Sequence, residues 1–98
     1  MLEKLFRPEK IAVVGASRHE GKTGHEVFDN LHHDFEGEVY PVNPRADEVE
    51  GEKAYDEIPR GSELAVIAVP AKIVPDVMKD AAEKDVEAAI IISAGFSE

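Results

Sequence analysis

Apolar residues fall into short runs along this chain, separated by polar segments. Three runs are nearly continuous and rich in β-branched residues, at positions 11–14, 64–69 and 88–92. Such runs are typical of parallel strands whose two faces are both covered. The runs at 11–14 and 64–69 are therefore predicted to be strands buried on both faces, and the run at 88–92 is predicted to be the last strand. Residues 38–42 are predicted to be another, ended by Asn43 and Pro44 because proline cannot donate a hydrogen bond to a neighbouring strand.

Two segments between these runs have the three- and four-residue spacing of amphipathic helices. The first apolar stripe consists of Val27, Phe28, Leu31 and Phe35. The second consists of Val77, Met78, Ala81 and Ala82. Pro75 precedes the second stripe and suits the first turn of a helix, where its missing amide hydrogen would have no partner.

The order of these elements predicts the fold class. Strand, helix and strand are followed by a polar connection at 45–61, with a short extended piece at 53–55, and then by a second strand, helix and strand. This alternation predicts an α/β Rossmann-like domain, a doubly wound parallel sheet forming one small domain over residues 1–98. Ligands of such sheets bind beyond the carboxyl ends of the strands, so functional residues are expected just after positions 14, 42, 69 and 92.

Composition narrows the choice of ligand and partner. Apolar residues make up 43% of the chain and charged residues 33%, as in ordinary globular domains. The net charge of −10 disfavours non-specific binding to nucleic acids or anionic membranes, so an anionic ligand must be held locally. Cysteine is absent from the sequence, which excludes thiolate chemistry and is consistent with a cytoplasmic location. The first ten residues resemble neither a signal peptide nor a membrane span.

The segment after the first strand is rich in glycine and is predicted to bind phosphate. Glycine lets backbone amides approach a phosphate, and the amino terminus of the following helix adds a partial positive charge. Side chains in the loop add hydroxyl and cationic groups. The candidate residues are Gly15, Ala16, Ser17, Arg18, Lys22, Thr23 and Gly24. The alternative is a tight turn that needs glycine only for its backbone angles.

Two named phosphate motifs fit this loop incompletely. In the dinucleotide pattern G-x-G-x-x-G, Ser17 occupies the place of the second glycine, and the next glycine comes four residues later. A P-loop would require Ala16 in place of its first glycine, and no later predicted strand ends in the acidic residue that helps to hold magnesium. The loop is therefore interpreted as an anion site of neither standard type.

The turn after the second strand carries Asn43, Pro44 and Arg45. An NAD-binding domain usually presents an acidic residue here to the adenosine ribose. An arginine instead suits a phosphate on the ribose, as in NADP or in the 3′-phosphate of coenzyme A (CoA). The alternative is an ordinary surface arginine.

The histidines are weaker candidates for a functional site than the strand ends. His25, Asp29 and His33 share one face of the first predicted helix and have the spacing of metal ligands. We interpret them as a solvated polar face, because metal ligands normally converge from several elements, and we predict no metal site. The acidic residues of 47–52 are likewise interpreted as a solvated loop. No nucleophile with an assigned base is recognisable, so no catalytic residue is predicted.

Four segments together resemble a known family. They are KIAVVGAS at 10–17, VYPVNPR at 39–45, LAVIAVPA at 64–71 and IISAGF at 91–96. In this order they are similar to the amino-terminal CoA-binding domain of NDP-forming acyl-CoA synthetases. That family includes the ADP-forming acetyl-CoA synthetases and is related to the succinyl-CoA synthetase alpha subunit. The resemblance covers nearly the whole chain.

The resemblance implies that CoA lies across the strand ends. The loop at 17–24 would hold the nucleotide phosphates, and 43–45 the ribose phosphate. The adenine and pantetheine side would be held by Val69, Pro70, Ala71, Lys72, Ser93, Ala94 and Gly95. The family's reaction passes through an acyl phosphate and a phosphohistidine in a later domain, which no segment here matches. The chain is thus expected to bind CoA without ligating it, as a truncated part of a ligase whose other domains or subunits are its partners.

Two further functions remain open from the sequence. A stand-alone CoA-binding protein with a regulatory or carrier role would have a similar first half. An NAD(P)-binding domain of an oxidoreductase or redox sensor is disfavoured by the poor glycine fingerprint and the missing acid. A truncated sheet also exposes an edge strand, which favours a homodimer.

Overall fold

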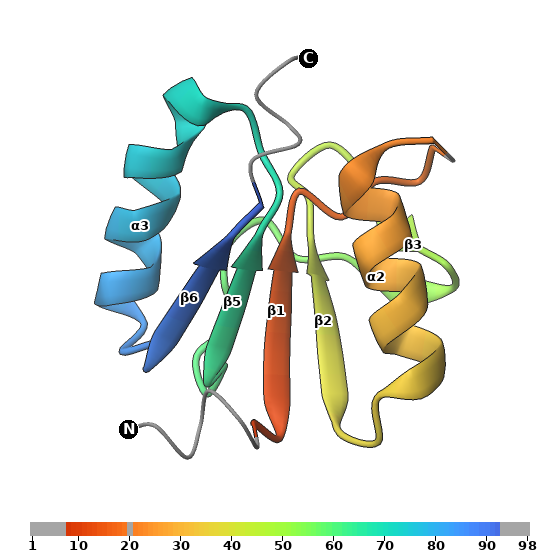
Figure 1. Ribbon diagram of the computed structural model, residues 1–98, viewed down its shortest axis with the longest axis horizontal. Coiled ribbons are helices and arrows are strands. Elements are labelled where there is room, and N and C mark those ends of the chain that lie inside the picture. The colour runs from red at the N-terminus through yellow and green to blue at the C-terminus, as the bar shows by residue number, and fades with distance from the viewer. Residues whose placement is uncertain (1–7, 20, 93–98) are drawn as a thin grey trace.

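A computed structural model of the chain describes residues 8–19 and 21–92. Its main sheet contains β1 (Lys10–Val14), β2 (Glu38–Val42), β5 (Leu64–Ile67) and β6 (Ala88–Ile91) in the order β2-β1-β5-β6. Every neighbouring pair is parallel, and all the arrows of this sheet point the same way in Figure 1. The predicted Rossmann-like α/β class is confirmed.

The helices lie on opposite faces of this sheet. Helix α2 (Thr23–Asp34) connects β1 to β2, and α3 (Val74–Glu83), preceded by the 3-10 turn η1 (Ala71–Ile73), connects β5 to β6 (Figure 1). Alternate residues of β1 separate the two cores: Ile11 and Val13 pack with Phe28 of α2, while Ala12 and Val14 pack with Ala81 on the α3 side. The near-continuous apolar run of β1 thus arises because both faces are covered.

The strand ends differ slightly from the prediction. Strand β5 ends at Ile67 instead of at position 69, although the amide of Ala68 still donates to the carbonyl of Val14 at 2.8 Å. The first helix ends before Phe35, which has an extended backbone. In α3 only Ala81 is fully buried, and Met78 is 39% exposed, so the second predicted stripe covers the sheet less completely than expected.

The polar connection contains an unpredicted hairpin. Strands β3 (Glu48–Val49) and β4 (Glu52–Lys53) pair antiparallel around a turn at Glu50 and Gly51. Val49, in β3, is fully buried. The other residues of 48–53 are exposed and, apart from Gly51, charged, which is why this sequence resembles a solvated loop.

The order of strands creates a switch point. Strand β1 lies between β2 and β5. Helix α2 connects β1 to β2 on one side of β1 and covers one face of the sheet, whereas α3 follows β5 on the other side of β1 and covers the other face. The carboxyl ends of β1 and β5 therefore border a crevice that neither helix closes. In the described part of the chain, no helix is long and apolar enough to cross a membrane.

Candidate functional site

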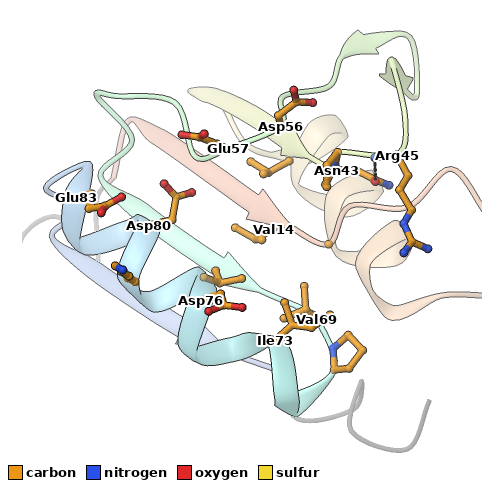
Figure 2. Close-up of a pocket in the computed structure, with 16 residues that line it drawn as sticks. Val14, Asn43, Arg45, Asp56, Glu57, Val69, Ile73, Asp76, Asp80 and Glu83 are labelled. Carbon is orange, nitrogen blue, oxygen red and sulfur yellow. Dashed lines mark hydrogen bonds between the residues drawn. The ribbon is translucent and has the colours of Figure 1, made fainter.

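A cavity of about 700 Å³ opens at the carboxyl ends of β1, β2 and β5 and extends along α3 (Figure 2). Its volume lies within the range typical of small-molecule sites, about 300–1,000 Å³. Predicted residues from three separate strand ends line it together: Gly15, Asn43, Pro44, Arg45, Val69 and Pro70. The convergence expected from a parallel sheet is therefore present.

The other predicted residues lie around this cavity in different ways. Ala16 is fully buried in the core on the α2 side, and Arg18 and Lys22 are exposed in the loop that leads into α2. Ala71 and Lys72 are exposed in η1, directly after Pro70. Ser93, Ala94 and Gly95 lie outside the described residues.

Gly15 forms the tight turn at the end of β1. Its φ of +91° suits glycine, and a Cβ atom there would lie 2.3 Å from the carbonyl oxygen of Ala68. Its amide donates to the carbonyl oxygen of Val42 at 3.0 Å. The turn is thus held against both neighbouring strand ends, and a side chain would separate them.

Gly24 brings α2 close to the same turn. It is buried in the first turn of the helix, where a Cβ atom would lie 1.8 Å from the carbonyl oxygen of Gly15. The N-cap residue, Lys22, makes no side-chain capping hydrogen bond, so the amides of the first turn have no helical partner and suit an anion. Gly24 therefore has a packing role beside its predicted role in the phosphate loop.

Asn43 joins the first two strand ends. Its side-chain Nδ2 donates to the carbonyl oxygen of Ala16 at 2.8 Å, and its Oδ1 accepts from the amide of Arg45 at 2.8 Å. Its own amide donates to the carbonyl oxygen of Tyr55 at 2.8 Å. Asn43 consequently acts as a positioning residue that orients the Arg45 turn relative to the glycine loop.

His25 supports the glycine loop from beneath. It is only 7% exposed, and its Nδ1 donates to the carbonyl oxygen of Ser17 at 2.8 Å. The hydroxyl oxygen of Ser17 accepts from the amide of His19 at 3.0 Å. The interpretation of His25 as part of a solvated face is therefore wrong, because the approach of α2 to the β1 turn buries its ring.

The cavity has a cationic end and an acidic side. Arg45 is exposed at one end, while carboxylates of 56–57 and of α3 flank the other side (Figure 2). These carboxylates belong to Asp56, Glu57, Asp76, Asp80 and Glu83. This acidic side was not predicted, because its members come from separate segments and follow no strand end.

Lys84 neutralises part of this acidic side. Its Nζ lies 2.6 Å from Asp80 Oδ1 and 2.8 Å from Glu57 Oε1. These hydrogen bonds, first to Asp80 and then to Glu57, raise the pKa of Lys84. Asp80 Oδ2 also accepts from the amide of Ile58 at 2.9 Å, so this carboxylate is fixed by internal contacts.

Fold and cavity together define a Rossmann-like α/β domain with a cavity at its switch point. The chain belongs to the CoA binding domain family, whose model matches residues 9–98. It is 48% identical to ADP-forming acetate–CoA ligase II of Archaeoglobus fulgidus over 99% of its length, but spans only 15% of that relative.

Solved structures show the same fold. The dinucleotide forming acetyl-coenzyme A synthetase 1 of Ca. Korarchaeum cryptofilum, in complex with phosphate and ADP, matches 98% of the chain with a TM-score of 0.89 and 43% identity. The match covers 22% of that protein. A conserved hypothetical protein from Pyrococcus furiosus matches 86% of the chain, and 74% of its own length, with a TM-score of 0.78 and 36% identity.

Proposed function

We propose that this chain binds CoA in the cavity at the ends of β1, β2 and β5, as the CoA-binding domain of an NDP-forming acyl-CoA synthetase. The observation that carries the proposal is the convergence of the glycine turn, the Arg45 turn and Pro70 on one cavity in a member of this family. The resemblance between the four strand-end segments and such ligases supports the same conclusion.

The charges of the cavity suggest how CoA is oriented. The phosphates belong beside Arg45, the Gly15 turn and the start of α2, since the carboxylates on the other side would repel them. In this orientation the 3′-phosphate pairs with Arg45. The uncharged adenine and pantetheine parts then follow the apolar wall made by Val14, Val69, Ile73 and Val77.

The chemistry of acyl transfer is assigned to other domains or subunits. The chain spans 15% of the A. fulgidus ligase and 22% of the Pyrococcus furiosus ADP-forming acetate–CoA ligase II subunit alpha, to which it is 48% identical. We infer that CoA is a substrate held here for a reaction completed elsewhere in a larger enzyme. The cytoplasmic location stays a prediction.

Calorimetry with CoA and with dephospho-CoA tests the proposal on wild type and on Arg45→Ala. A lost charge-assisted phosphate contact of about 1.5–3 kcal/mol corresponds to a roughly ten- to hundredfold weaker affinity for CoA. Dephospho-CoA lacks this phosphate, so its affinity should be nearly the same for both proteins. Lys10→Ala, at the opposite end of β1, removes the same charge and should change neither affinity. Equal affinities for CoA and NAD, or an equal loss for both CoA forms, would refute the assignment.

A stand-alone CoA-binding protein is the second candidate. It is favoured by the Pyrococcus furiosus hypothetical protein, of which this chain covers 74%. The full reading frame separates the candidates: a frame that ends near Glu98 favours the small protein, and one that continues into a phosphohistidine domain favours the ligase. The NAD and NADP titrations test the remaining oxidoreductase alternative.

Self-association is the last part of the proposal. Strand β6 is one of the two edge strands of the described sheet, and its Ile90 and Ile91 are 43% and 45% exposed. Another domain of a ligase or a second copy of the chain would cover these residues. Sedimentation of the chain alone distinguishes a monomer from a dimer.

A further inference from the structure

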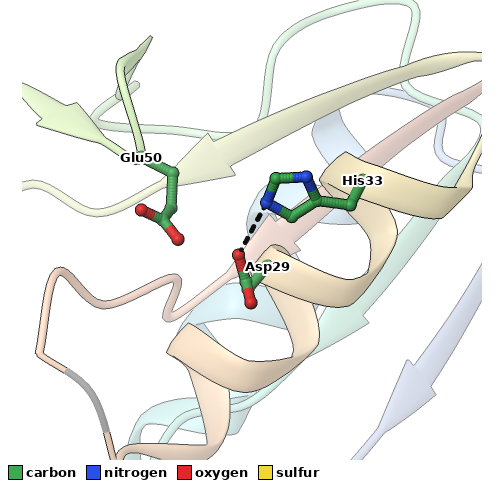
Figure 3. A group of neighbouring side chains, drawn as sticks. All are labelled: Asp29, His33 and Glu50. Atoms are coloured by element: carbon green, nitrogen blue, oxygen red, sulfur yellow. Dashed lines mark ion pairs between the residues drawn. The ribbon is translucent and has the colours of Figure 1, made fainter.

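Possible metal ligands gather on the outer side of α2, where it faces the β3–β4 hairpin (Figure 3). Asp29 and His33 lie one helical turn apart, with Asp29 Oδ1 3.1 Å from His33 Nε2. Glu50 approaches them from the hairpin turn, and one ligand atom from each of the three lies within 4.8 Å of the others. From the sequence, only Asp29, His33 and their neighbour His25 were recognisable as a group, because the hairpin was not predicted.

We propose that Asp29, His33 and Glu50 form a binding site for Zn²⁺ or a similar divalent transition metal. Tetrahedral zinc with ligands at about 2.0–2.1 Å holds its ligand atoms about 3.3 Å apart. The Asp29–His33 separation of 3.1 Å already fits this spacing. Glu50 needs to move by only about 1.5 Å, and its side chain is 36% exposed and at the tip of a turn.

The ligand types select the kind of metal. An imidazole nitrogen beside two carboxylates suits zinc, cobalt or nickel, whereas calcium and magnesium prefer oxygen ligands alone. Two ligands from one helix and one from a separate hairpin also provide convergence from different elements, which was missing in the helix considered alone.

His25 supplies an independent observation. Its side chain is 9% exposed, and its second ring nitrogen, Nε2, lies 3.9 Å from Glu50 Oε1. The carbonyl oxygen of Ser17 accepts a hydrogen bond from Nδ1 at 2.8 Å, so the ring is held in one orientation. A nearly buried imidazole nitrogen is therefore fixed beside Glu50, in addition to the three proposed ligands.

A bound metal would fasten the hairpin to α2. The hairpin lies in the same connection as Asn43 and Tyr55, which are joined by a 2.8 Å hydrogen bond beside the cavity. The site would thus stabilise the segment that carries Arg45 without itself contacting the cavity. This inference is independent of the identity of the ligand in that cavity.

Titration of the chelator-treated chain with ZnCl₂ by calorimetry, and with CoCl₂ by visible absorption, tests the site. Wild type should bind one ion, with cobalt bands typical of nitrogen and oxygen ligands, and should melt at a higher temperature with Zn²⁺. His33→Ala and Glu50→Asn should each weaken Zn²⁺ binding about tenfold or more. Asparagine suits the backbone of residue 50, which has a φ of 53°, so Glu50→Asn should fold at least as well as wild type.

His19→Ala is the matched control, because it removes an exposed histidine outside the cluster. It should bind Zn²⁺ with wild-type affinity. The proposal fails if wild type binds no ion, if binding leaves the melting temperature unchanged, or if His33→Ala and Glu50→Asn bind as tightly as His19→Ala.

Discussion

Replacing Gly24 by alanine has two opposed effects on stability, a gain in helix propensity and a loss in packing. Alanine in a helix is favoured over glycine by about 1 kcal/mol, so propensity alone predicts a more stable protein. In the structure, the new Cβ atom would lie 1.8 Å from the carbonyl oxygen of Gly15, whereas real Cβ contacts essentially never fall below 3.0 Å. The start of α2 must therefore move away from the β1 turn by more than about 1 Å.

The β1 turn has little freedom to accommodate this movement. The amide of Gly15 donates a hydrogen bond to the carbonyl oxygen of Val42, and Gly15 has no room for a Cβ atom beside the carbonyl of Ala68. Overpacking of such sites costs about 1–3 kcal/mol, and a clash with fixed backbone belongs at the upper end. After the gain in propensity, the expected net loss is about 2 kcal/mol, which lowers the melting temperature of a domain of this size by about 8–16 °C.

Thermal unfolding followed by circular dichroism measures this effect. Asn30→Ala is the matched control, since Asn30 is exposed in the same helix and gains propensity without a clash. It should melt at or slightly above the wild-type temperature. If Gly24→Ala melted as high as Asn30→Ala, the close contact between α2 and the Gly15 turn would be refuted.

Two other substitutions test the site and the pH dependence. Asn43→Ala removes the bonds to Ala16 and to the Arg45 amide, so it should destabilise the chain by about 1–3 kcal/mol in chemical denaturation and weaken CoA binding in calorimetry; unchanged values would contradict its positioning role. Burial, and then the hydrogen bond and charge of Glu38, raise the pKa of Tyr40. The folded state thus favours the protonated phenol. The resulting contribution to the free energy of unfolding is fully present below the unfolded-state pKa near 10 and is lost as pH rises through the pKa of the folded state. In an ultraviolet titration, Tyr40→Phe should lack the high-pH part of the absorbance change, and an identical titration curve would exclude the shift.

The two central strands, β1 and β5, were predictable because both of their faces are buried. A continuous apolar run such as that of β1 then indicates the strand by itself, and Asn43 and Pro44 mark where β2 ends. The convergence of Gly15, Arg45 and Pro70 follows from the direction of parallel strands alone.

Features that depend on tertiary contacts were not predictable. The hairpin buries a single residue, Val49, so its sequence lacks the alternation of apolar and polar residues that indicates a strand. His25 is buried because Gly24 lets the helix approach the β1 turn, which a helical pattern does not reveal. Glu50 is adjacent to α2 for the same kind of reason, since only the folded hairpin brings it there.

The central place of β1 has a consequence for synthesis of the chain. This strand is the first of the sheet to emerge, yet one of its two neighbours, β5, lies more than half of the chain away in sequence. A nascent chain can pair β1 with β2 through α2 at once, but the other side of β1 stays open until Ile67 has been made. Arrested translation before that point would leave an apolar strand without its second neighbour, which is a state that molecular chaperones recognise.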